Sequence, residues 1–127
     1  MHNWFAKLVG KTLKQSIRIT EDSFFKGVYS GSGDIELYGS FDGSLYVKNL
    51  YIKKSGIFIG YVSAENIIVE GEMNADIQTE NLHLKSTGVV DGDVMYRNIV
   101  IDSGGMLKSQ KVQNISKMKN LIKLTNK

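Results

Sequence analysis

The sequence contains neither cysteine nor proline. Without cysteine, disulfide bonds, thiol catalysis and cysteine-ligated metal sites are excluded, and a reducing cytoplasm is a fitting environment. Because proline removes a backbone hydrogen-bond donor, its absence favours a body built on regular backbone hydrogen bonding. No apolar run approaches the roughly 18–20 residues that a membrane-spanning helix needs, and neither end resembles a secretory signal. The 127 residues suit one compact domain.

Acidic residues are missing from both ends of the chain. Residues 1–20 hold four basic residues and no acid, and residues 108–127 hold six lysines and no acid. Between them, residues 21–107 hold six basic and thirteen acidic residues, a formal charge of −7. The sequence therefore predicts an acidic body with two basic ends, and basic ends attract polyanions such as lipid headgroups or nucleic acid.

A short motif, asparagine–apolar–any–apolar, recurs four times. It reads NLYI at 49–52, NIIV at 66–69, NLHL at 81–84 and NIVI at 98–101, with intervals of 17, 15 and 17 residues. Each copy is preceded by a glycine and two further apolar positions, so that four apolar columns align. The columns are Phe41, Phe58, Met73 and Val90; Leu45, Val62, Ile77 and Val94; Leu50, Ile67, Leu82 and Ile99; and Ile52, Val69, Leu84 and Ile101.

The period of the apolar residues predicts the fold class. Alternation at period two inside each run indicates strands with one buried face, and recurrence at about 17 residues indicates one supersecondary unit stacked on itself. We expect an all-β chain that forms a parallel β-helix of about five to six short coils, with the columns inside. A left-handed β-helix would show a hexapeptide period and 18-residue coils. Neither is present, so we predict the right-handed form.

The fixed glycines and asparagines are expected to lie at corners between strands. Glycine opens the copies at Gly39, Gly56, Gly71 and Gly88, where we expect a positive φ. Asparagine enters the left-handed region more readily than most residues, and stacked amides bond coil to coil. We therefore interpret Asn49, Asn66, Asn81 and Asn98 as structural residues.

The run from about Gly27 to Ser109 resembles the bactofilins, bacterial polymer-forming cytoskeletal proteins. The stretch that carries the resemblance is GYVSAENIIVEGEMNADIQTENLHLKSTGVVDGDVMYRNIVIDSGGMLK. The resemblance implies a right-handed β-helix with flexible tails. It also implies end-to-end assembly into nonpolar filaments without nucleotide, often attached to the membrane. Many family members have proline-rich tails, whereas the tails of this chain have no proline.

We expect three regions: a basic amphipathic N-terminal tail at 1–20, a polymerising β-helix at 21–109 and a basic C-terminal tail at 110–127. Large apolar side chains alternate with lysines near the N-terminus, which is typical of a segment lying in the membrane interface. The predicted membrane-binding residues are Trp4, Phe5, Lys7, Leu8, Val9 and Lys11. The alternative is that this segment caps the first coil. For the C-terminal tail, membrane contact, capping and disorder remain equal alternatives.

A β-helix has two open ends at which backbone groups and apolar columns lack a next coil, and such edges invite pairing. The repeat pattern stops without an obvious rigid cap at either end. We therefore predict a polymer interface formed by Tyr29, Ile35 and Leu37 at one end and by Met106 and Leu107 at the other.

Enzymatic and nucleic-acid-binding functions are the alternatives to a scaffold. β-Helices also host polysaccharide lyases and hydrolases, and Asp76 and Asp93 are expected one coil apart beside Asp91. No basic partner shares their columns, so a solvated acidic face is the simpler interpretation. His2 and His83 are too few and too distant for a metal site, and no cofactor is predicted. An acidic body repels nucleic acid and no recognition module is present, so a contact of nucleic acid with the basic tails alone remains as the alternative.

We therefore predict a structural scaffold with no enzymatic activity. It assembles end to end into nonpolar, nucleotide-independent filaments at the cytoplasmic face of the bacterial inner membrane. There it positions unidentified client proteins for cell shape or envelope work. Its expected partners are further copies of itself and an anionic membrane surface, with no specific nucleic acid. The alternative is a β-helical enzyme or binding module acting on cell-wall polysaccharide.

Overall fold

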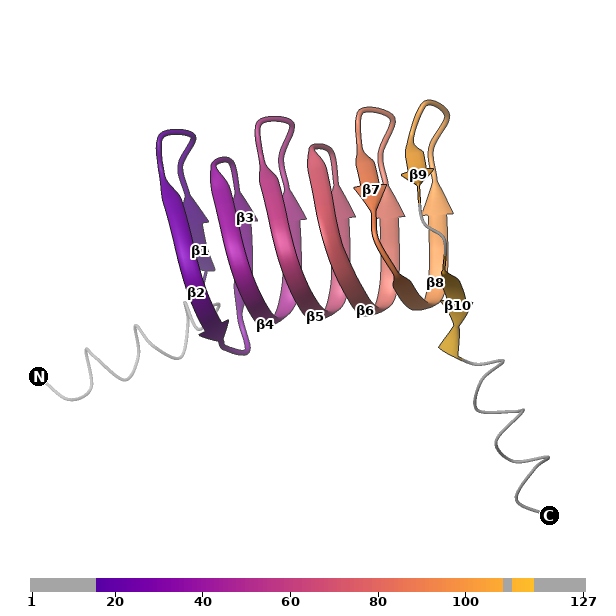
Figure 1. Cartoon of the computed structure of the whole chain (residues 1–127), viewed down its shortest axis with the longest axis horizontal. Coiled ribbons are helices and arrows are strands. Elements are labelled where there is room, and N and C mark those ends of the chain that lie inside the picture. The colour runs from indigo at the N-terminus through magenta and orange to yellow at the C-terminus, as the bar shows by residue number, and fades with distance from the viewer. Residues whose placement is uncertain (1–15, 109–110, 116–127) are drawn as a thin grey trace, which may run out of the picture.

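A computed structural model describes residues 16–108 and 111–115, and these residues are almost entirely β-strand. The strands are β1 (Ser16–Ile19), β2 (Phe24–Ser30), β3 (Asp34–Leu37), β4 (Ser40–Ile52), β5 (Ile57–Val69), β6 (Glu72–Leu84), β7 (Val89–Asp91), β8 (Val94–Ile101), β9 (Met106–Lys108) and β10 (Val112–Asn114). Every pairing between them is parallel. The chain therefore winds as a parallel β-solenoid of about six coils, whose stacking is clear in Figure 1.

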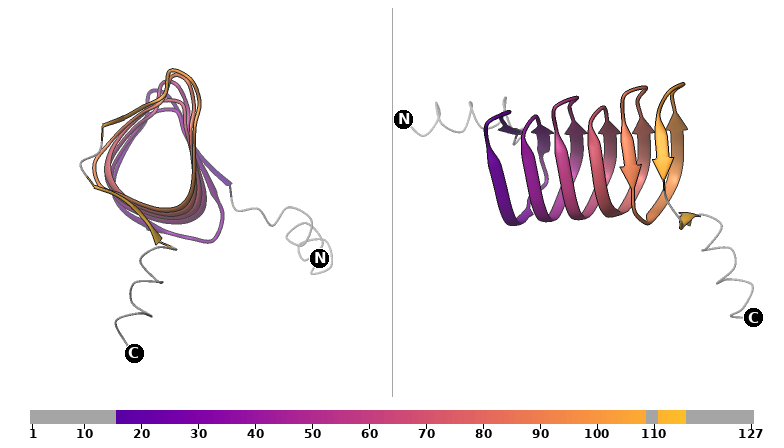
Figure 2. Two further views of the ribbon diagram at one scale, coloured as in Figure 1. Left: turned by 90° about the vertical axis from the view of Figure 1, so that its right-hand side faces the viewer. Right: turned by 45° about the horizontal axis from the view of Figure 1, so that its top comes forward.

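The long strands β4, β5 and β6 each run around most of one coil. Their registers agree with the alignment of the repeats, because Leu50 pairs with Ile67 and Ile67 pairs with Leu82. Viewed along the solenoid, the coils superpose in a rounded triangular outline (Figure 2). The predicted all-β, coil-on-coil architecture is confirmed.

The core is a set of ladders of like side chains that runs the length of the solenoid. The rings of Phe25, Phe41 and Phe58 stack with centroid distances of 4.7 and 5.2 Å. Of the sixteen predicted column residues, all except Ile77, Ile99 and Ile101 are at most 1% exposed. They are Phe41, Phe58, Met73, Val90, Leu45, Val62, Val94, Leu50, Ile67, Leu82, Ile52, Val69 and Leu84. Ile77 is 3% exposed, so the predicted columns form the core.

The last column positions depart from the prediction. Ile99 is only partly buried, and Ile101 is 46% exposed. Both lie in the second half of β8, which pairs with β6 on one side. Within the described residues no strand covers its other side, because β10 pairs only with the first half of β8. Ile101 is therefore an end residue rather than a core residue.

Glycine recurs at the start of each repeat for a reason other than the predicted positive φ. None of Gly39, Gly56, Gly71 and Gly88 has a positive φ, and among the described residues neither does any asparagine. At Gly56 a Cβ would collide with the carbonyl oxygen of Leu37, so close backbone approach excludes a side chain there. Positive φ occurs instead within strands at Gly27, Gly43 and Gly60, the last with φ of 129°, and between strands at Gly92 and Gly104.

Paired strands of the solenoid also lie outside the predicted bounds of the β-helix, residues 21 and 109. β1 begins at Ser16 and pairs residue by residue with β3, so the solenoid starts inside the predicted N-terminal tail. β10 lies inside the predicted C-terminal tail and pairs with β8. Both strands are short and have neither a glycine nor an asparagine at the positions of the repeat, since Asn114 of β10 pairs with Tyr96 rather than Asn98, and the alignment therefore missed them.

Candidate assembly surfaces

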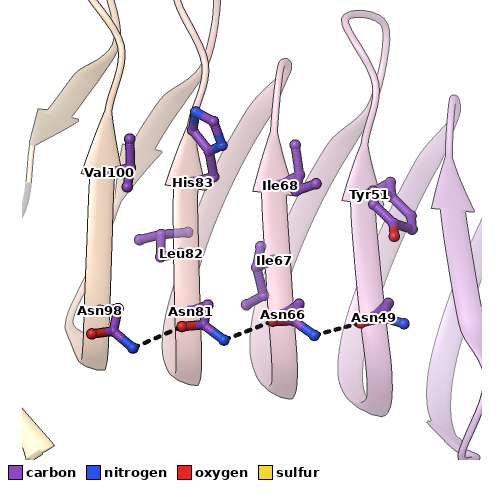
Figure 3. A pocket seen from close by; sticks show the side chains of 10 residues that line it. All are labelled: Asn49, Tyr51, Asn66, Ile67, Ile68, Asn81, Leu82, His83, Asn98 and Val100. Atoms are coloured by element: carbon purple, nitrogen blue, oxygen red, sulfur yellow. Dashed lines mark hydrogen bonds between the residues drawn. The ribbon is translucent and has the colours of Figure 1, made fainter.

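One face of the solenoid carries an unbroken ladder of asparagine side chains. The Nδ2 group of each asparagine donates to the Oδ1 atom of the asparagine one coil nearer the N-terminus. The distances are 2.8 Å from Asn66 to Asn49, 2.8 Å from Asn81 to Asn66 and 2.9 Å from Asn98 to Asn81. Asn49 in turn donates to Asp34 at 2.7 Å. The expected bonding of amides from coil to coil is confirmed (Figure 3).

A shallow groove of about 340 Å³ follows this ladder. Beside the asparagines it is lined by the outward column Tyr51, Ile68, His83 and Val100 (Figure 3). Tyr51, Ile68 and His83 are half-buried, and Val100 is 53% exposed. The groove contains no carboxylate and no lysine or arginine. It is therefore a partly apolar strip, lined by no acidic or basic residue other than His83, on a body whose residues 21–107 carry a formal charge of −7.

The N-terminal end of the described solenoid carries aromatic and aliphatic side chains. Among the described strands, β1 pairs only with β3 and β2 pairs only with β4, so each leaves one edge unpaired. Phe25 and Tyr29 of β2 are partly buried and pack against the core from this end. Phe24 and Val28 on the outer side of the same strand are 65% and 69% exposed. Tyr29, one of the predicted interface residues, thus lies at this end of the described solenoid.

Two other predicted interface residues are not at the end. Ile35 and Leu37 are 2% and 0% exposed, because they pair with Ile17 and Ile19 of β1 on their outer side. The outermost apolar residues of this end are therefore Ile17 and Phe25. Sequence reasoning missed Ile17 because four residues of alternation, SIRI, are too short a signal beside a basic tail.

The C-terminal end is aliphatic. Among the described strands, β9 pairs only with β7, so its other edge is unpaired. Leu107 is partly buried against the core, whereas Met106 points outward and is 48% exposed. With Ile99 and Ile101 of β8, Leu107 leaves an apolar surface at this end. Both residues predicted here belong to the terminal coil, although only Leu107 packs against the core.

The predicted membrane-binding residues Trp4, Phe5, Lys7, Leu8, Val9 and Lys11 all lie outside the described residues. The same holds for the C-terminal tail beyond residue 115. Within residues 16–108 and 111–115, no helix has the length and apolar character needed to cross a membrane.

The acidic side chains do not form a site. Asp76, Asp91 and Asp93 are exposed. In the described part of the chain, no three histidine or acidic residues are placed to hold a metal ion. His83 Nε2 lies 3.0 Å from Asp102 Oδ1, an ion pair between neighbouring coils when the imidazole is protonated. In residues 16–108 and 111–115, Asp76, Asp91 and Asp93 are thus solvent-exposed side chains, in agreement with the predicted solvated acidic face.

Comparison with known proteins agrees with this picture. A solved filament structure, described as a cryo-EM reconstruction of Thermus thermophilus bactofilin double helical filaments, superposes with a TM-score of 0.67 at 20% sequence identity. The match covers 77% of this chain and 95% of that one. No curated protein matches the sequence significantly. The family model for bactofilin, described as polymer-forming cytoskeletal, matches residues 17–111. That span runs from the first coil to the last, so the chain belongs to the bactofilin family of polymer-forming cytoskeletal proteins.

Proposed function

We propose that this chain assembles end to end into nonpolar filaments that need no nucleotide. The filaments lie on the inner face of the bacterial membrane and position other proteins for cell shape or envelope work. Membership of a polymer-forming cytoskeletal family supports the polymer. The direction of assembly and the membrane contact rest on the residues of this chain.

The observation that carries the proposal is that both ends of the described solenoid are open. At each end, strands have one unpaired edge beside a partly buried apolar residue, Phe25 at one end and Leu107 at the other. Unpaired edges invite pairing with another chain. Contact through both ends would extend the coil stack and the apolar columns from one copy into the next.

The chemical difference between the two ends supports a nonpolar filament. The N-terminal end offers the flat ring of Phe25, which already stacks on Phe41 at 4.7 Å, and the C-terminal end offers aliphatic Leu107. Aromatic rings gain about 0.5–1.5 kcal/mol by pairing with each other. Each end therefore fits its own copy through a two-fold contact, and two different two-fold contacts per molecule generate an unlimited filament without polarity.

Electron microscopy of the purified full-length protein tests assembly. We expect filaments without added nucleotide at both low and high salt, because apolar contacts depend little on ionic strength. Ile59→Arg serves as a control variant, because the Ile59 side chain lies on the flank of the solenoid and is 46% exposed. This control should form filaments as the wild type does. Globular particles of the size of one chain, in the wild type under all conditions, would contradict the proposal.

The proposed membrane contact rests on the alternation of Trp4, Phe5, Leu8 and Val9 with Lys7 and Lys11. A lysine near an anionic leaflet contributes about 1 kcal/mol, and tryptophan favours the headgroup region. A filament repeats this weak anchor many times, and multivalency raises the total affinity steeply. Assembly and membrane binding would therefore reinforce each other.

A further inference from the structure

A second groove lies on the other side of the corner that carries the asparagine ladder. Its volume is about 220 Å³, and it is lined by Ser63, Ala64, Glu65, Gln78, Thr79, Glu80 and Ile115. Each of its two glutamates is followed in the chain by an asparagine of the ladder. The acidic groove, which contains the glutamates, and the ladder groove, which follows the asparagines, therefore meet along this corner.

The last residue that the structure describes is seated in the acidic groove. Asn114 of β10 donates from Nδ2 to the carbonyl oxygen of Arg97 at 3.2 Å, which holds the end of the described chain against β8. Ile115 follows, is partly buried and lines the acidic groove together with residues of β5 and β6. The chain therefore leaves its last coil beside this groove.

The flank around the acidic groove carries carboxylates. On β6, Asp76 and Glu80 alternate with buried residues and so face outward together. Glu65 of β5 is exposed, and within residues 16–108 and 111–115 it forms no ion pair. Arg97 is already bound to Glu80 at 2.6 Å, and Lys48 occupies the place equivalent to Glu65 one coil nearer the N-terminus. A cationic segment that starts at the chain exit therefore meets these carboxylates before it reaches Lys48.

The segment that follows Ile115 matches the corner in charge and in polarity. Residues 116–127 hold four lysines and no acidic residue, whereas residues 21–107 carry a formal charge of −7. At physiological salt such opposite charges attract over about 8 Å. Among the lysines lie the apolar residues Met118, Leu121, Ile122 and Leu124. The ladder groove offers them the half-buried Ile68 and Val100, which is 53% exposed (Figure 3).

The segment is also long enough to cover the corner. From Asn98 to Asn49 the ladder crosses three coil spacings, a distance of about 14 Å. Twelve residues span about 18 Å in an α-helix and about 40 Å in an extended chain. Residues 116–127 can therefore reach across the ladder in either conformation.

We propose that residues 116–127 dock on this corner of their own solenoid, with their lysines at the acidic groove and their apolar side chains in the ladder groove. The contact is intramolecular, and a short tether gives an effective concentration in roughly the millimolar range, so weak interactions are sufficient. Docking withholds these lysines from membranes and leaves the membrane contact proposed above to the N-terminal tail. The inference does not depend on filament formation.

The N-terminal tail is the other segment of this chain that leaves near the ladder. Ser16 pairs with Asp34, and Asp34 pairs with Asn49, so Ser16 continues the ladder position into the first described coil. Ser16 is exposed and lines neither groove, however, whereas Ile115 is seated in one of them. This difference favours the C-terminal segment as the occupant.

A disulfide between the ladder groove and the segment tests docking. The chain has no cysteine, so Ile68→Cys with Leu121→Cys introduces two thiols. The matched control is Ile59→Cys with Leu121→Cys, because Ile59 is 46% exposed on another flank of the same strand. We expect the first pair to form an intramolecular disulfide about tenfold faster than the control pair. Equal rates would overturn the proposal, and so would covalent dimers in place of the intramolecular product.

The same chemistry identifies the occupant. Ile68→Cys with Phe5→Cys places the second thiol in the N-terminal tail, and this pair should react as slowly as the control. If it reacts faster than the pair with Leu121→Cys, the N-terminal tail occupies the corner and the proposal is wrong. Circular dichroism establishes that each variant is folded.

A charge reversal keeps both thiols in place and is therefore independent of the length of the tether. Glu65→Lys should slow the disulfide between Ile68→Cys and Leu121→Cys severalfold, because it sets a lysine against those of the segment. Glu72→Lys changes the net charge equally at an exposed position on another flank and should leave the rate unchanged. Equal slowing by both variants would mean that net charge alone acts, which would exclude the acidic groove.

Fluorescence provides a measurement that leaves the ladder groove intact. Trp4 is the single tryptophan of the chain, so Trp4→Phe with Ile122→Trp moves the indole into the C-terminal segment. In a chain that also carries Phe25→Arg and Leu107→Arg to block assembly, we expect emission at shorter wavelength than in the unfolded chain. Adding Glu65→Lys should shift the emission toward that of the unfolded chain. Emission of the folded protein at the wavelength of the unfolded chain would contradict docking.

Discussion

Asn66 donates from Nδ2 to Oδ1 of Asn49 at 2.8 Å, and this bond joins equivalent positions of two successive coils. Its own Oδ1 accepts from Asn81, so every donor of the ladder is directed toward the N-terminus. The amides repeat at the spacing of paired strands, about 4.8 Å, only when the coils are in register. The ladder therefore links the repeat of the sequence to the register of the solenoid.

Removing an inner rung should cost more than removing the last described rung. Asn66→Ala removes two side-chain hydrogen bonds and Asn98→Ala removes one. At about 1 kcal/mol for each bond, we expect losses in the free energy of unfolding of roughly 2 and 1 kcal/mol. Chemical denaturation measures both losses when each variant also carries a substitution that blocks assembly. Equal losses for the two variants would mean that the ladder contributes little.

A charge inside the solenoid should prevent folding. Ile67 is 1% exposed and stacks between Leu50 and Leu82, so Ile67→Asp buries an unpaired carboxylate at a cost of several kcal/mol. We expect loss of soluble folded protein in circular dichroism. Ile59→Asp is the control on the outside of the same strand and should melt within a few degrees of the wild type. A stable Ile67→Asp protein would contradict the observed columns.

In the column of Gly43, Gly60 and Ala75, a methyl side chain should be tolerated at residue 75 but not at residue 60. Gly60 has φ of 129°, and its Cβ would collide with the carbonyl oxygen of Gly43. The next residue of the column, Ala75, carries a Cβ already. Gly60→Ala should therefore destabilise the fold by about 1–3 kcal/mol or more. Thermal melting measures the loss of stability, and Ala75→Gly is the control for a change of one methyl group. Equal melting temperatures of the two variants would refute the steric argument.

Blocking one end should stop assembly at dimers. Leu107→Arg places a charge at the C-terminal end, so copies can join only through their N-terminal ends, and Phe25→Arg does the reverse. We expect each variant to form dimers of constant size over a wide concentration range, and the double variant to be monomeric, in light scattering. If each single variant is monomeric, the ends join head to tail and the filament is polar. Persistent filaments of Leu107→Arg would exclude the C-terminal contact.

The first residues should direct membrane association. Deletion of residues 1–14, or Trp4→Glu combined with Phe5→Glu, should release the protein from anionic liposomes in sedimentation experiments. The β signal in circular dichroism should be unchanged, because β1 begins at Ser16. The control is Leu121→Glu with Ile122→Glu in the other basic tail. If only that control releases the protein, the C-terminal tail is the anchor.

The interior of this protein was predictable because its periodicity is strong and local. Alternation at period two, repeated about every 17 residues, determines which residues point inward, and so Phe58 and Ile67 were placed correctly. The asparagine ladder followed for the same reason, since equivalent positions of a stacked repeat must adjoin. The ends were not predictable in this way. Ile35 has the sequence pattern of a terminal residue, yet β1 covers it.

The amino-acid sequence by itself determined that the chain is a stack of coils, which columns are buried and which residues bond from coil to coil. Only the tertiary structure decided where the stack begins and ends, because a terminal strand of three or four residues has no period to detect. It also decided why Gly56 carries no side chain: the carbonyl group of Leu37 lies where a Cβ would be. That clash arises between two successive coils of the folded solenoid, so no local pattern of residues expresses it.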